Sequence, residues 1–129
     1  MSRETVLGKD AFLVSETDAK GVIKFANEDF CKVAGYSLEE LVGKPHNMVR
    51  HPDMPKKAFK SLWDTVKQGD IWTGYVKNAT KDGGYYWVFA TVYPFESSDN
   101  SKGYLSCRRK PTSEEIIKAE KLYEQWRKE

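Results

Sequence analysis

Two short apolar runs near the N-terminus, residues 12–14 and 22–25, flank the sequence Asp18-Ala19-Lys20-Gly21. Short apolar runs on either side of a turn that ends in glycine predict a β-hairpin. Residues 1–10 are predicted to form a polar lead-in to this hairpin.

Two short helices are predicted next. Asn27 can cap a helix over residues 27–34, because its side chain can accept a hydrogen bond from a free backbone N–H, and Gly35 suits the position where that helix stops. Ser37 and Glu40 have the spacing of a capping box for a second helix, which the next glycine ends.

A longer helix is predicted over residues 55–68. Pro55 suits its first turn, and Gly69 ends it. Its apolar residues recur at spacings of one, three and four and form one stripe, made of Ala58, Phe59, Leu62, Trp63 and Val66.

Strand-forming residues dominate most of the remaining sequence. Residues 71–80 and 84–95 are separated by the hairpin turn Lys81-Asp82-Gly83, and a further strand is predicted over 102–109. The order of elements predicts an α+β fold, in which a five-stranded antiparallel sheet carries short helices on one face and a helix follows at the C-terminus.

Alternation along these strands separates two faces of the sheet. Asn78 shares a face with Trp72 and Val76, so a polar amide is expected to point into an apolar interior. The next strand carries large apolar residues on both faces, with Trp87 and Phe89 on the outer one. The outer face is therefore expected to meet another helix or a second subunit.

Thr112 and Glu115 have capping-box spacing for a final helix over residues 113–127. Its apolar residues are spaced three, four and three apart, namely Ile116, Ala119, Tyr123 and Trp126. This seam suits a coiled coil, and equally a helix that folds back onto the outer face of the sheet.

The segment from Gly43 to Pro55 contains both histidines and three of the five prolines. Proline fixes φ and removes a backbone donor, so at most a single helical turn fits here, around His46 to Arg50. A stiff polar segment of this kind either uses its side chains in a binding site, or is a rigid connector in which Arg50 and Asp53 satisfy local backbone groups.

Composition narrows the function classes. A net charge of +2 on 129 residues argues against a nucleic-acid partner. Two cysteines without framework spacing and the lack of a signal peptide indicate a cytoplasmic setting. No apolar run approaches about 20 residues, so no membrane contact is expected within the chain. No paired carboxylates, nucleophile–base set or metal-ligand cluster stands out, which predicts neither an enzyme nor a metal site.

With these elements in place, the sequence resembles the PAS sensor fold, and residues 43–55 resemble the signature of PAS domains from bacterial aerotaxis receptors. The likeness continues through Trp72-Thr-Gly-Tyr-Val-Lys-Asn78 and Tyr86-Trp87-Val88 and covers about residues 12–117. The resemblance implies a sensor domain over 11–110, followed by a signalling or linker helix over 111–129.

PAS domains of that family bind FAD non-covalently and report redox state or oxygen supply to chemotaxis signalling. The resemblance therefore implies FAD as cofactor and a downstream chemotaxis domain or protein as partner. The apolar outer sheet face and the C-terminal helix also allow a homodimer. By the same resemblance, Arg50, His51, Asp53 and Trp63 occupy positions tied to FAD, and Asn78 lies on the flavin-facing strand.

The chemistry of the residues suits FAD. Trp63 and Trp72 can stack on the flat ring system, and Arg50 and Lys44 can hold the pyrophosphate. Asp53 would then orient Arg50 or His51. His46 completes the set of expected cofactor-binding residues.

Two alternatives keep the fold and change the ligand. Haem b could bind through His46 or His51, and a cofactor-free module could dimerise or dock a partner through Trp87 and Phe89. Residues 47–51 contain no cysteine, unlike the reactive segment of related light-sensing domains, so a flavin–cysteine photoadduct is not expected.

Overall fold

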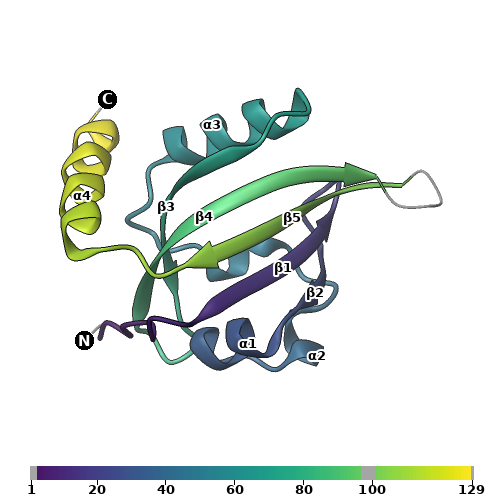
Figure 1. Cartoon of the computed structure of the whole chain (residues 1–129), viewed down its shortest axis with the longest axis horizontal. Coiled ribbons are helices and arrows are strands. Elements are labelled where there is room, and N and C mark those ends of the chain that lie inside the picture. Colours follow the sequence, from purple (N-terminus) through teal and green to yellow (C-terminus); the bar gives the residue numbers. More distant parts are fainter. Residues whose placement is uncertain (1–2, 97–100, 129) are drawn as a thin grey trace.

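The computed structural model describes residues 3–96 and 101–128, and over these ranges the chain forms one antiparallel five-stranded sheet (Figure 1). The strand order is β2-β1-β5-β4-β3. The strands are β1 (Phe12–Asp18), β2 (Ile23–Ala26), β3 (Trp72–Ala79), β4 (Tyr85–Glu96) and β5 (Lys102–Arg109). The helices are α1 (Glu28–Ala34), α2 (Leu38–Leu41), the 3₁₀ turn η1 (His46–Val49), α3 (Lys56–Lys67) and α4 (Ser113–Arg127). The predicted α+β architecture is confirmed.

The predicted caps account for where the short helices start. Asn27 Oδ1 accepts hydrogen bonds from the backbone N–H of Phe30 at 3.0 Å and of Val14 at 3.1 Å. The same side chain donates to the carbonyl of Phe12 at 2.8 Å, so one residue caps α1 and fastens it to β1. Both predicted capping boxes, at the starts of α2 and α4, are present.

The core lies between the inner face of the sheet and the short helices. Fully buried side chains from every layer meet there, among them Leu13, Phe30, Leu41, Tyr86 and Val88. Helix α3 contributes less to this core than its stripe predicted, because only Ala58 and Val66 are buried. Phe59, Leu62 and Trp63 are partly exposed, and they line the pocket described below.

Residues of the predicted polar lead-in take part in the sheet. The backbone around Glu4 runs parallel to β4 at Tyr85, where Thr5 N donates to the Tyr85 carbonyl at 2.8 Å and Tyr85 N donates to Arg3 O at 3.0 Å. Leu7 is buried in the core. Pairing of this kind uses backbone groups only, so the side-chain pattern could not reveal it. Residues 1 and 2 lie outside the described ranges.

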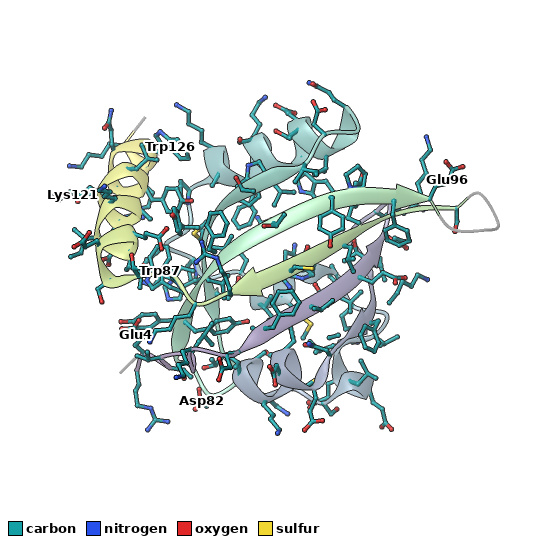
Figure 2. All side chains as sticks on the ribbon, viewed as in Figure 1. Glu4, Asp82, Trp87, Glu96, Lys121 and Trp126 are labelled. Atoms are coloured by element: carbon teal, nitrogen blue, oxygen red, sulfur yellow. The ribbon has the colours of Figure 1, made fainter. Side chains whose placement is uncertain are left out.

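Helix α4 folds back onto the outer side of β3 and β4, which is one of the two arrangements expected for it. Its Tyr123 ring stacks on Trp87 with centroids 6.3 Å apart, and the Tyr123 hydroxyl donates to the carbonyl of Tyr75. The Tyr75 hydroxyl in turn donates to Glu115 near the start of the helix. Figure 2 shows Trp126 on the side of α4 toward the domain and Lys121 on the far side.

The C-terminal end of α4 also touches the proline-rich segment. Arg127 Nη1 donates to the carbonyl of Asp53 at 2.6 Å, and the Lys57 ammonium lies 5.2 Å from the centre of the Trp126 ring. Within the described residues, no helix is long and apolar enough to cross a membrane.

Tyr123→Ala should detach α4. The change removes a ring that is 5% exposed and leaves a void, at a cost of about 3 kcal/mol in the free energy of unfolding. Tyr123→Phe keeps the stack and loses one hydrogen bond, at about 1 kcal/mol. Chemical denaturation measures both, and Lys121→Ala on the exposed side is the control. Equal stability of the Ala and Phe variants would contradict the packing role of the ring.

Candidate functional site

A pocket of about 320 Å³ opens on the inner face of the sheet, between the strands, the turn around Gly21, the η1 region and α3. This volume falls within the range of small-molecule sites. One wall is aromatic and comes from α3, where Trp63 meets Tyr104 of β5 edge to face with ring centroids 5.3 Å apart. The opposite wall is aliphatic and includes Val76 and Val92.

Basic residues give the pocket its charge. Lys20, Arg50 and Arg108 line it, and none of the described residues in the lining is acidic. The guanidinium of Arg50 lies 3.6 Å from the centre of the Phe59 ring, a cation–π contact that holds the side chain against α3. The electrostatic character of the pocket therefore favours an anionic ligand.

A hydrogen-bonded trio, made of Arg108, Ser15 and His46, joins β5, β1 and η1 beside the pocket. Arg108 Nη2 donates to Ser15 Oγ at 2.9 Å and lies 2.8 Å from His46 Nε2, while Ser15 Oγ lies 3.1 Å from the same ring nitrogen. Because a guanidinium can only donate, His46 Nε2 must accept, and the neutral imidazole carries its proton on Nδ1.

Both ionisable members of the trio have shifted pKa values. Burial, and then the charge of Arg108, lowers the pKa of His46 to about 3, so the imidazole is neutral at physiological pH. Burial lowers the pKa of Arg108 to about 10, which still leaves it charged. Arg108 is 4% exposed, and its Nη1 has no hydrogen-bond partner among the described residues.

Asn78 points into the pocket as the alternation of β3 predicted. It is 3% exposed, and its Nδ2 reaches the hydroxyl of Tyr86 at a long 3.5 Å. Its backbone forms an isolated bridge with Arg50, which attaches the proline-rich segment to β3. The amide thus keeps most of its hydrogen-bonding capacity for a ligand.

Four of the expected site residues line the pocket and four do not. Arg50, His46, Trp63 and Asn78 line it. Lys44 is exposed, and its carbonyl accepts from Ile23 N at 2.9 Å. Trp72 lies over Gly74 and donates from Nε1 to Ser61 Oγ at 3.2 Å.

His51 and Asp53 face the edge of β3, away from the pocket. The His51 ring meets Tyr85 edge to face with centroids 5.9 Å apart, and its Nδ1 accepts from Asp53 N at 3.0 Å. The Asp53 carboxylate pairs with Lys77 Nζ at 2.9 Å, and this bond lowers the pKa of the carboxyl. The Asp53 carboxylate thus ties the proline-rich segment to the Lys77 side chain of β3.

Sequence reasoning missed Arg108 and Lys20. The signal for Arg108 was available, because Tyr104, Ser106 and Arg108 alternate on the inward face of the predicted last strand. Lys20 lies in a turn, where strand alternation does not predict which way a side chain points. No group of three or more His, Cys, Asp or Glu side chains in residues 3–96 and 101–128 is arranged to hold a metal ion.

A family model described as the PAS fold matches residues 23–107. The chain is 49% identical over 121 residues to the aerotaxis receptor of Escherichia coli strain K12, an alignment that covers 94% of this chain and 24% of that receptor. The chain thus spans about a quarter of that relative's length.

Solved structures show the same architecture. A PAS domain from Colwellia psychrerythraea matches with a TM-score of 0.69 and 28% identity over 78% of this chain and 86% of that one. A light-oxygen-voltage domain studied with a flavin analogue matches with a TM-score of 0.74 and 20% identity over 88% of this chain and 87% of that one. The second likeness concerns the fold alone.

The buried neutral His46 predicts a stability that falls in acid. Its pKa is about 3 when folded and 6.5 when unfolded, so the unfolded chain binds the proton more readily. His46 therefore destabilises the fold as the pH drops below 6.5, by at most about 1.4 kcal/mol per pH unit. Denaturant titrations between pH 7 and 4 measure the slope, which His46→Gln should flatten.

His51→Gln is the matched control for this experiment, because its ring lies outside the trio and its loss should leave the slope closer to that of the wild type. If wild type and His46→Gln have the same pH slope, His46 does not carry the acid sensitivity.

Proposed function

The chain belongs to the PAS fold family, and from that premise we propose that it is a sensor module that binds FAD non-covalently in this pocket. The module would report redox state or oxygen supply to chemotaxis signalling, a role in keeping with its 49% identity to a protein named as an aerotaxis receptor. We propose no catalytic role for the chain. Its two free cysteines, Cys31 and Cys107, suit a cytoplasmic site of action.

The composition of the pocket is the observation that carries this proposal. It combines flat aromatic and aliphatic walls with three basic side chains and, in the part of the chain described, no acidic one. FAD has the complementary character, because it joins a flat, largely apolar ring system to an anionic pyrophosphate.

Different residues of the pocket would hold different parts of the cofactor. The ring system would lie against Trp63 and the aliphatic wall, deep enough for Asn78 and Arg108 to donate to its polar edge. Arg50 and Lys20, on the 3₁₀-turn side and the hairpin turn, would hold the pyrophosphate. When bound, the flavin supplies a group that takes up and releases electrons reversibly.

Haem is the weaker alternative. An axial histidine needs a free lone pair on a ring nitrogen, and the Nε2 lone pair of His46 already accepts from Arg108 at 2.8 Å. His51 lies outside the pocket, with its Nδ1 accepting from the Asp53 backbone. The cofactor-free alternative loses one of its two proposed docking residues, Trp87, which α4 covers to 6% exposure.

We propose that β3 carries the signal from the pocket to α4. Val76 and Asn78 face the pocket, while the carbonyl of Tyr75 on the same strand receives the hydrogen bond from Tyr123 of α4. A change in what Asn78 binds would shift β3 and alter the seating of the helix. Residues 11–110 would then form the sensor and 111–129 the output helix, which leads to a further domain, a partner protein or a second copy.

Absorption spectra and a tryptophan replacement test the cofactor. The purified protein should be yellow, with flavin bands near about 370 and 450 nm. Trp63→Ala removes a wall of the pocket and should weaken FAD binding at least tenfold, which corresponds to about 1.4 kcal/mol. Trp126→Ala makes the same change on α4, outside the pocket, and should leave affinity unchanged. Full flavin affinity in Trp63→Ala would remove that residue from the site.

Hydrogen exchange tests the path through β3. Asn78→Leu should still bind FAD but lose the difference in protection of β3 and α4 between the oxidised and reduced protein. The difference should be lost because leucine offers the flavin ring neither a hydrogen-bond donor nor an acceptor. An undiminished difference in Asn78→Leu would place the switch elsewhere.

A further inference from the structure

Arg108 is a buried cation without a buried anion. Its side chain comes from the inward face of β5, it is 4% exposed, and the residues of the described chain that meet its guanidinium are neutral: Ser15, His46 and the Phe30 ring, whose centre lies 5.0 Å away. Removing an arginine from water without a carboxylate partner is costly, and proteins rarely keep such an arrangement unless something else compensates the charge.

The other ionisable groups near Arg108 do not neutralise it. The Tyr86 hydroxyl is protonated at physiological pH, because burial raises the pKa of this tyrosine to about 12. His46 is neutral and contributes only its lone pair. Cys107 points to the outer face of the sheet, where its sulfur lies 3.3 Å from the Tyr93 hydroxyl.

One donor of the guanidinium is also unused. Nη2 bonds Ser15 and His46, whereas Nη1 is enclosed and has no partner in residues 3–96 and 101–128. A buried donor left without an acceptor costs about 1–3 kcal/mol. Since other parts of Arg108 line the pocket, a ligand in the pocket can supply the negative charge that the protein withholds.

We propose that Arg108 is the group that tunes the redox preference of the pocket: it donates to a carbonyl or ring-nitrogen acceptor of the bound flavin and stabilises the reduced ring, which is richer in electrons, relative to the oxidised ring. This inference rests on the proposed FAD site and adds to it a specific role for one residue. The trio fixes the guanidinium in place, so its charge acts on the ring at a constant position and in a medium of low dielectric constant.

The role of Arg108 differs from that of Arg50 and Lys20. Those two side chains lie on irregular segments, and their charge is proposed to hold the pyrophosphate, which does not change on reduction. Charge near the ring instead changes the relative affinity for its two redox states, which appears as a shift in midpoint potential. The role of Arg108 is therefore tested by the midpoint potential of the bound flavin and not by FAD affinity alone.

The test compares Arg108→Gln with wild type by anaerobic titration of the FAD-loaded protein with dithionite as electron donor and a reference dye. Arg108→Gln should reduce the preference for the reduced state at least tenfold, a fall in midpoint potential of about 30 mV for a two-electron couple or about 59 mV for a one-electron couple. Arg108→Lys retains the charge and should move the potential less. Arg109→Gln removes a charge from the next residue, on the outer face of β5, and should leave the potential unchanged.

A second variant keeps Arg108 and cancels its charge, in case Arg108→Gln does not fold. Ser15 Oγ lies 2.9 Å from Nη2, so Ser15→Asp places a carboxylate beside the guanidinium and should also lower the potential. Ser15→Asn is nearly the same size without the charge, and its shift should be smaller. Circular dichroism confirms folding in each case.

The outcomes separate the two proposals. Flavin bound by every variant with the same potential in wild type, Arg108→Gln and Ser15→Asp overturns the role of Arg108 and leaves the FAD site standing. An equal fall in Arg109→Gln would also overturn it, because the effect would then be one of net charge. Wild-type protein that neither retains nor takes up FAD overturns the proposed function and this inference together.

Discussion

The hydrogen bonds of Arg108 hold together the three elements around which the pocket is built. They join β5 to β1 through Ser15 and to the 3₁₀ turn through His46, at 2.9 and 2.8 Å. The polar trio keeps its members at fixed separations and offers the pocket a charge, at the cost of an imidazole that acid can protonate and of one unsatisfied donor. The aromatic wall on α3 and the amide of Asn78 line the same pocket as the Arg108 guanidinium.

Much of the fold followed from local rules, since caps, hairpin turns and strand alternation act over a few residues. Asn27, Ser37 and Thr112 start helices where their hydrogen bonds predicted, and alternation placed Asn78 on the inner face. The candidate site followed less well, because residues 43–55 are irregular. Which way their side chains point depends on tertiary pairing: His51 N donates to the carbonyl of Lys77 at 3.3 Å, which turns His51 toward Tyr85 and brings Asp53 to Lys77. No periodic pattern encodes that choice.

The first residues of the chain also bind the sheet, through backbone hydrogen bonds that a side-chain pattern does not reveal. The segment around Glu4 pairs with Tyr85 of β4. This part of β4 lies beyond the end of its pairing with β5, which stops at Arg109. Both this segment and α4 thus attach to the first residues of β4, close to Trp87, so the two flanking parts of the chain share a short stretch of one strand. A disturbance of that strand would reach them together, which suits a module whose output lies outside the sheet.

Gly21 shows how narrowly the pocket is kept open. Its φ of +85° suits glycine, and a Cβ there would stand 3.4 Å from the Trp63 ring, at the rim of the cavity. A larger residue would be strained and would also crowd the entrance, without touching the trio, β3 or the seat of α4. A single substitution at this position could therefore narrow the pocket and leave the architecture of the domain unchanged.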